Sequence, residues 1–237
     1  MRLGYISVGI VLDYVKYTEA CNMLLNDKMI IYEERIGDDF DEKCNTLTGI
    51  KLSYVNDPVN VLKLVFSKLK EKSLCIIFAF NGHLDCLKYA RGNGCPWDEG
   101  TCMYAARKGH LDCLKYAHEN RCLWNSETCK LAAANGHLDC LKYAHENGCE
   151  WTEITCYYAV SGGHLNCLKY AHENGCKWDE LTCFNAAYYG HLDCLKYARE
   201  NGCPWDEYTC SNAALNGHFD CLKYAKENGC PWNSVTC

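Results

Sequence analysis

The chain has 237 residues, 49% of them hydrophobic and 23% charged, a balance that is ordinary for a globular protein with a buried core. Its formal net charge of -6 at pH 7 argues against nucleic acid as a partner, because affinity for a phosphate backbone comes largely from Lys and Arg side chains. No apolar run reaches the roughly 18 residues that a membrane-spanning helix needs, so we expect no membrane partner either.

Residues 1–56 form a non-repeat N-terminal segment of uncertain structure. We expect a helix over most of residues 8–25 and a strand or extended stretch over residues 29–34. Residues 3–12 resemble a weak signal-peptide core, but Asp13 follows directly and no small-residue cleavage site stands out. The sequence therefore favours an intracellular, cytoplasmic protein over a secreted one.

Residues 57–72 are interpreted as a degenerate half-repeat that caps the regular part of the chain. Residues 61–65 have the apolar character of the second helix of the repeats but lack its Cys and Tyr. Stacked repeat arrays usually need such a cap.

Residues 73–237 repeat with a period of 27 residues. A Gly-His pair and a Lys recur at this interval, and all six tryptophans lie in register, at Trp97, Trp124, Trp151, Trp178, Trp205 and Trp232. The period defines six repeats and the start of a seventh, with boundaries at 73–99, 100–126, 127–153, 154–180, 181–207 and 208–234. Such self-similarity indicates an array in which each unit buries its apolar face on its neighbours.

Each repeat predicts two short helices. Asp98 is a suitable N-cap for a first helix that ends at Gly109. Cys102, Ala105 and Ala106 share one face of this helix at i, i+3 and i+4, and their small size lets a neighbouring helix approach closely. The second helix begins near the Gly-His pair and stops at an Asn-Gly pair, since Gly favours the left-handed conformation that ends helices.

The stretch Ala-Ala-x-x-Gly-His-Leu-Asp at residues 105–112, followed by Leu114-Lys115 and a later Gly, resembles the helix pair of the ankyrin repeat. The resemblance covers residues 73–237 and implies an all-α, ankyrin-like helix-turn-helix solenoid that binds other proteins. Ankyrin units have about 33 residues, so the shorter unit here implies that the β-hairpin fingers are shortened or absent. The Cys- and Trp-rich version is similar to ankyrin-type proteins of giant DNA viruses and some protists, which implies a viral protein in a host cell.

Eighteen of the 21 cysteines occupy three positions of the repeat. Zinc is disfavoured, because antiparallel helices place Cys95 and Cys102 about 10 Å from His110 and Cys113. Disulfides between equivalent cysteines are also disfavoured, because stacked helices lie about 8–10 Å apart and a disulfide needs Cα atoms within about 7 Å. A Cys95–Cys102 type of bridge stays open. We expect reduced thiols that act as small buried hydrophobes, with no metal and no other cofactor.

The other recurring residues have structural interpretations. By resemblance to the family, His110 and its equivalents hydrogen bond the backbone at the turn, and Trp97 and its equivalents wedge between repeats. Asp112 and Lys115 form an i, i+3 pair that contributes only a few tenths of a kcal/mol, and we interpret the lysine stripe as a solvated face.

Positions that vary between otherwise similar repeats are candidates for contact with a partner. They lie on the first helix, just after the Thr-Cys pair and just before the Gly-His turn. The candidate partner-binding residues are Ile76, Phe80, Met103, Arg107, Lys108, Lys130, Asn135, Tyr157, Phe184, Tyr188, Tyr189 and Leu215. Aromatic residues are enriched at binding hot spots, which favours Tyr157, Phe184, Tyr188 and Tyr189. The alternative is neutral drift on a solvated surface.

The sequence predicts a protein-binding scaffold rather than an enzyme. It contains no nucleophile elbow, phosphate-binding loop or metalloprotease helix, and repeated residues make a poor unique active site. The resemblance implies a host-directed adaptor, and a partner or self-association is expected to cover the uncapped C-terminal end. The competing hypothesis is a metal- or redox-responsive Cys/His-rich protein.

Overall fold

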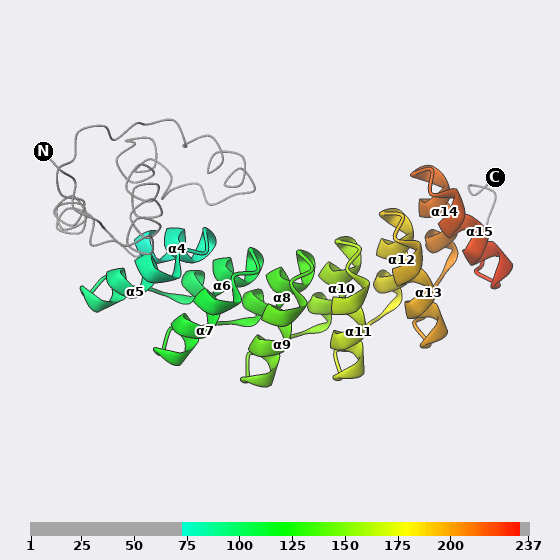
Figure 1. The fold of residues 1–237 in the computed structure, drawn as a ribbon. Coiled ribbons are helices and arrows are strands. Elements are labelled where there is room, and N and C mark those ends of the chain that lie inside the picture. The colour runs from blue at the N-terminus through cyan, green and yellow to red at the C-terminus, as the bar shows by residue number, and fades with distance from the viewer. Residues whose placement is uncertain (1–72, 233–237) are drawn as a thin grey trace, which may run out of the picture. The chain divides into compact units, whose positions relative to one another are not determined.

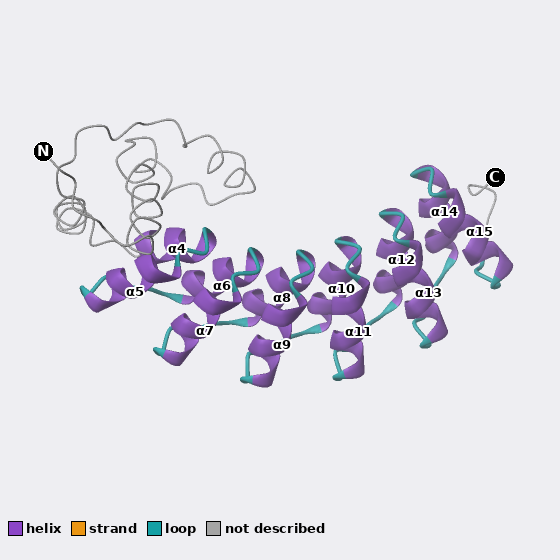
Figure 2. Cartoon of the chain, in the orientation of Figure 1, coloured by secondary structure: helices purple, strands orange, loops and turns teal. Residues whose placement is uncertain are grey.

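A computed structural model describes residues 73–232, and Figure 2 shows that helices and loops alone make up this range. The all-α expectation is therefore confirmed, and no β-hairpin finger occurs between residues 73 and 232. The chain divides into two compact units, Met1–Asp98 and Glu99–Cys237. The expectations for residues 1–56, for the half-repeat at 57–72 and for the start of a seventh repeat fall outside the described residues.

Each described repeat is a pair of helices of eight or nine residues. The first unit contains α4 (Ser73–Phe80) and α5 (Leu84–Gly92), which pack on each other. The first helices of the pairs in the second unit are α6 (Glu99–Arg107), α8 (Ser126–Ala134), α10 (Glu153–Ser161), α12 (Glu180–Tyr188) and α14 (Glu207–Leu215). The second helices there are α7 (Leu111–Glu119), α9 (Leu138–Glu146), α11 (Leu165–Glu173), α13 (Leu192–Glu200) and α15 (Phe219–Glu227).

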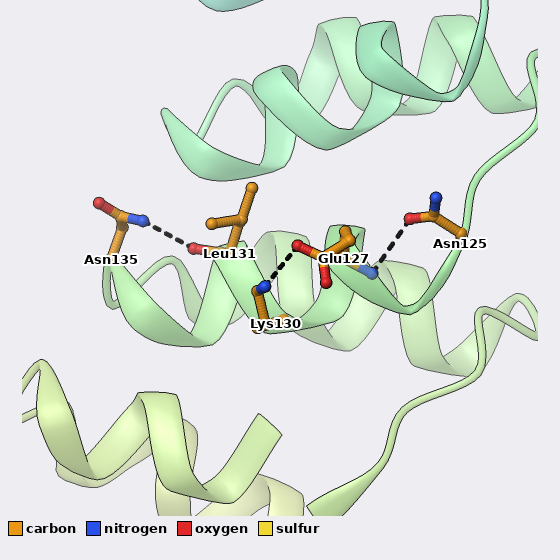
Figure 3. Close-up of polar contacts among 5 residues, drawn as sticks. All are labelled: Asn125, Glu127, Lys130, Leu131 and Asn135. Carbon is orange, nitrogen blue, oxygen red and sulfur yellow. Dashed lines mark hydrogen bonds and ion pairs between the residues drawn. The ribbon is translucent and has the colours of Figure 1, made fainter. Parts of the chain in front are cut away.

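Side-chain caps start several of the first helices. The side chain of Asn125 accepts a hydrogen bond of 3.0 Å from the backbone N–H of Glu127 (Figure 3). Asp179 and Asp206, at the position equivalent to Asp98, do the same for α12 and α14. Each cap satisfies a backbone donor that has no partner inside the helix.

A glycine in the left-handed conformation ends each first helix. Gly136 has φ 76°, and the following His137 donates its N–H to Ala132 O at 2.9 Å while Gly136 N–H bonds Ala133 O. This pair of bonds is a Schellman motif, which satisfies the last carbonyls of the helix. The chain then turns directly into the second helix, because His137 is already its N-cap.

The same motif ends each second helix, with one change of residue. Gly148, for example, has φ 84°, and Cys149 N–H bonds Ala144 O at 2.9 Å. In the second repeat the equivalent position is Arg121, the single non-glycine residue with positive φ, 66°, among residues 73–232. The predicted Asn-Gly stop is therefore confirmed at Gly148 and replaced by a strained residue at Arg121.

In the second unit the helices stack in two rows, as Figure 1 shows. The first helices contact one another in the order α6, α8, α10, α12, α14, and the second helices in the order α7, α9, α11, α13, α15. Cys102, Ala105 and Ala106 are fully buried, as expected, and Leu114 of the second helix is fully buried as well. Small side chains on the first helices let their backbones approach closely.

Within the second unit, the recurring histidine joins a repeat to the one before it. The imidazole of His191 lies 3.2 Å from Ser161 O in the preceding repeat, so the expected hydrogen bond to backbone is present. The same ring covers Gly163, where an added Cβ would lie 2.6 Å from Nδ1 of His191. A glycine is needed at this position both for its positive φ and for the close approach of the next histidine.

Candidate protein-binding site

The predicted contact residues differ in exposure. On α4, Ile76 is half-buried and Phe80 is only 6% exposed, so Phe80 offers little surface to a partner. In the second unit the half-buried candidates are Met103, Arg107, Lys108, Lys130, Tyr157 and Phe184. The exposed candidates are Asn135, Tyr188, Tyr189 and Leu215.

Three predicted aromatic residues form one cluster at the end of α12. The rings of Phe184 and Tyr188 stack at 6.1 Å, and Tyr189 packs edge-on against Tyr188 at 4.8 Å. On α10, Tyr157 packs against Tyr158 instead, at 5.2 Å. Edge-on and stacked rings gain energy beyond area burial, so these side chains are held in place before any partner arrives.

A second exposed apolar row was missed by the sequence analysis. Ile154, Leu181 and Tyr208 occupy equivalent positions in the first turns of α10, α12 and α14, and are 47%, 48% and 59% exposed. The signal was available, because the same position is Gly100 and Glu127 in the earlier repeats. Its variation was overlooked in favour of positions next to the Thr-Cys pair and the turn.

The aromatic cluster and this exposed row lie on one face of the first helices. Leu181, Phe184 and Tyr188 lie at i, i+3 and i+7, which places them on one side of α12. Because α10, α12 and α14 pack side by side, this face continues across three repeats. We call it the apolar face and define it by Ile154, Tyr157, Leu181, Phe184, Tyr188, Tyr189, Tyr208 and Leu215.

The earlier repeats present charged groups instead. On α8, Lys130 pairs with Glu127 at 2.5 Å, and its ammonium also lies 4.9 Å from the ring centroid of Tyr158 (Figure 3 shows the ion pair). On α6, Arg107 stands in the position that Tyr188 and Leu215 occupy later in the chain. The surface of the first helices therefore changes from charged to apolar along the array.

The second helices carry a repeated aromatic contact between neighbouring repeats. His118 stacks on Trp124 with centroids 3.7 Å apart, and its Nδ1 lies 3.0 Å from the hydroxyl of Tyr143 in the next repeat. Trp124 meets Tyr143 edge-on at 6.1 Å, so the expected wedge between repeats is present. Burial lowers the pKa of His118 and raises that of Tyr143.

The lysines that recur on the second helices lie close to the tyrosine rings of these contacts. Lys115 lies 5.6 Å from the ring centroid of Tyr143, and Lys142 lies 5.6 Å from that of Tyr170. Among the described ion pairs, none joins Lys115 or Lys142 to the Asp three residues before it, and each ammonium instead lies near the tyrosine ring of the next repeat, whose face is partly negative.

The cysteines are buried and pair in an unexpected way. None of the eighteen cysteines in the described part of the chain forms a disulfide, and none is more than 4% exposed. The thiol of Cys129 donates to Cys149 O at 3.8 Å and lies beside the Cys149 thiol, which donates to Asn125 O at 3.1 Å. The neighbouring thiols are thus 20 residues apart rather than the seven of a Cys95–Cys102 bridge.

The contact between the two thiols shifts their pKa values in opposite directions. The hydrogen bond between the thiols, followed by burial, raises the pKa of Cys129 far above its ordinary value. The same hydrogen bond lowers the pKa of Cys149. The pattern recurs in the pairs Cys156–Cys176 and Cys183–Cys203.

The described residues offer neither a cluster of metal ligands nor a helix that could cross a membrane. Between residues 73 and 232, no group of three or more His, Cys, Asp or Glu side chains is arranged to hold a metal ion. In the same range, the helices are too short and too polar to cross a membrane.

Known proteins show which family this architecture resembles. A family model for ankyrin repeats (3 copies) matches residues 129–207. The crystal structure of the human ASB11 ankyrin repeat domain superimposes with a TM-score of 0.59 and 20% sequence identity, covering 66% of this chain and 84% of that one. No curated protein matches the sequence. Residues 129–207 therefore match the ankyrin-repeat family, and the helical array has the fold of an ankyrin repeat domain.

Proposed function

We propose that the array is a scaffold that binds a partner protein through the variable surface of its first helices. Ankyrin repeats are in general protein–protein interaction modules. The observation that carries the proposal is the apolar face, where Tyr188, Tyr189 and Leu215 are 40%, 45% and 71% exposed. Contiguous exposed apolar surface marks interaction sites more often than isolated apolar residues do.

The centre of the proposed site is the aromatic cluster of α12. Tyr is enriched among the residues that dominate binding energy, and such residues lie near the middle of an interface. Tyr188 and Tyr189 are central in the apolar face, since α12 lies between α10 and α14. The half-buried Tyr157 and Phe184 border the cluster.

The proposal also includes the cellular location and the class of partner. The eighteen described cysteines are buried and form no disulfide, which supports an intracellular, cytoplasmic location, where thiols stay reduced. A role as a host-directed adaptor follows from the resemblance to viral proteins, with a protein rather than nucleic acid or a membrane as the partner and no catalytic role. A partner or a second copy would also cover the last described pair, where Phe219 is 73% exposed.

Affinity capture from host-type cell lysate, followed by mass spectrometry, tests the scaffold. One variant changes Tyr188 and Tyr189 to Ser, and a second changes Tyr157, Phe184, Tyr188 and Tyr189 to Ala. A matched control changes the exposed Glu146 and Glu173 of the second helices to Ala. We expect a partner that the wild-type and control proteins retain and both face variants lose.

The first variant keeps the test sound, because its two side chains are exposed and their loss leaves the core intact. Circular dichroism verifies that each variant is folded. Capture of the same proteins by the wild type, both face variants and the control would show that the apolar face is not the binding site.

A second candidate function, a redox-responsive protein, is favoured by the thiol pairs. In the proposed step, the Cys149 thiolate attacks oxidised glutathione and releases one reduced glutathione. The Cys129 thiol then attacks the Cys149 sulfur of the mixed disulfide, loses its proton in that step and releases the second reduced glutathione, so two thiols lose two protons and two electrons and form one disulfide. Tandem mass spectrometry after incubation with oxidised glutathione tests this function. A Cys129–Cys149 crosslink supports it, and unmodified Cys129 and Cys149 thiols in the folded protein oppose it.

A further inference from the structure

The chemistry of the apolar face restricts the kind of partner that it fits. We propose that α10, α12 and α14 bind a polypeptide segment of the partner that carries large apolar side chains flanked by lysines or arginines. This inference rests on the proposed scaffold function and adds the partner's chemistry to it.

The first observation is a row of glutamates beside the apolar row. Glu153, Glu180 and Glu207 are exposed, and each directly precedes the exposed Ile154, Leu181 or Tyr208. The salt bridges found between residues 73 and 232 involve none of the three. Each repeat thus offers one carboxylate next to one apolar side chain.

The second observation is the absence of basic residues from these helices. The sequences of α10, α12 and α14 contain no Lys or Arg. In the linkers that precede them, the single base, Lys177, is outweighed by Glu150, Asp179 and Asp206. The apolar face therefore lies in a negative field, which attracts cationic side chains and repels acidic ones.

The third observation is the limit of this surface along the array. On α6 and α8 the equivalent face carries Arg107 and Lys130, and Glu127 is already paired with Lys130. The glutamate position is occupied by Glu99 on α6 and by Ser126 on α8, but neither has an exposed apolar neighbour. A segment that is both apolar and basic is therefore favoured on α10 to α14 over α6 and α8. Like charges placed opposite each other across an interface suppress the wrong register.

The spacing of the helices indicates how such a segment would lie. Packed helices are about 8–10 Å apart, so anchors on α10, α12 and α14 recur at this distance. Residues seven apart on a helix are separated by about 10 Å. An amphipathic helix with apolar residues at every seventh position, and basic residues beside them, therefore meets all three repeats.

The test uses a synthetic probe and the full chain. The probe is a capped 21-residue amphipathic peptide with Leu at positions 4, 11 and 18, Lys beside each Leu, and a fluorescent label. Two matched peptides carry Glu in place of Lys or Ser in place of Leu. We expect the Leu/Lys peptide to bind and both matched peptides to bind at least tenfold more weakly in fluorescence anisotropy.

Two triple variants with equal net charge locate the site. Glu153→Gln, Glu180→Gln and Glu207→Gln together should weaken binding about tenfold, since each exposed ion pair contributes a few tenths to 1 kcal/mol. The control triple, Glu146→Gln, Glu173→Gln and Glu200→Gln on the second helices, should bind as the wild type does. Equal loss in both variants would show non-specific attraction and overturn the inference.

The outcomes separate this inference from the scaffold itself. If lysate capture depends on Tyr188 and Tyr189 while the glutamate variant binds the peptide normally, the scaffold stands and the basic partner is wrong. Binding of the Leu/Glu peptide at equal affinity would also overturn the inference.

Discussion

At the scale of single residues, the tightest constraints lie at the two turns of each repeat. Both turns need a positive φ, but only the first is also crowded. An added Cβ at Gly136 would lie 2.6 Å from the ring of His164. A Cβ added at Gly148 would have no neighbouring atom within 4 Å. The Asn-Gly pattern predicted the second turn from sequence, but the crowding at the first depends on the next repeat and was not visible.

Arg121 is the residue where this constraint is violated. An L-residue other than Gly pays about 1 kcal/mol or more for a left-handed conformation. We expect Arg121→Gly to raise the free energy of unfolding by about 1 kcal/mol, as measured by urea denaturation. A lower urea midpoint in the variant would contradict the strain at φ 66°.

The two glycine positions provide a matched comparison. Gly148→Ala should cost about 1 kcal/mol for conformational strain alone. Gly136→Ala should cost clearly more, because the histidine of the next repeat must move as well. Urea midpoints of the two variants measure the difference, and equal losses would show that the histidine yields freely.

At the scale of helices, caps and turns are local, so the helix pairs could be predicted from sequence almost completely. The thiol pairing could not, because Cys129 and Cys149 meet only after two helices have packed. Exposure of Ile154, Leu181 and Tyr208 is likewise set by which side of the first helix the neighbouring repeats cover. Their variation was visible in the sequence, whereas their exposure was not.

The histidines between helices make stability depend on pH. Burial lowers the folded-state pKa of His118, His137 and His172 below its ordinary value of about 6.5. The unfolded chain then binds more protons than the folded one below pH 6.5, so stability falls as pH decreases through this window. We expect a lower urea midpoint at pH 5.5 than at pH 7.5.

A single substitution checks the cause of that pH dependence. Arg199 stacks on Trp205 at 4.5 Å, in the position that His172 holds against Trp178. His172→Arg should therefore keep the stacking while removing one titrating group, which reduces the difference between the two pH values. An unchanged difference would assign the effect to other groups.

At the scale of the whole molecule, the second unit is a one-dimensional stack in which each repeat contacts its neighbours. The 27-residue period and the ankyrin-like fold followed from the sequence because every repeat carries the same information. The proposed binding surface did not follow in the same way, since the positions that differ between repeats include exposed and buried ones.

Deletion of residues 126–152, which removes α8 and α9 and leaves α10 whole, tests this modularity. The deletion joins two repeats in register, so we expect a folded protein with a lower urea midpoint, because one set of interfaces is lost. The apolar face on α10, α12 and α14 remains, and the Leu/Lys peptide should still bind. Loss of all helical circular dichroism would show that the repeats do not act as independent layers.

The Trp rings that pack against His and Tyr between neighbouring repeats are also intrinsic fluorescent probes of those junctions. Trp124, Trp151 and Trp178 each lie against the tyrosine of the following repeat. Opening of one junction changes the surroundings of one indole. A series of proteins in which a single tryptophan is kept, with Phe at the others, would therefore report by fluorescence the order in which the layers separate when the array is pulled or heated.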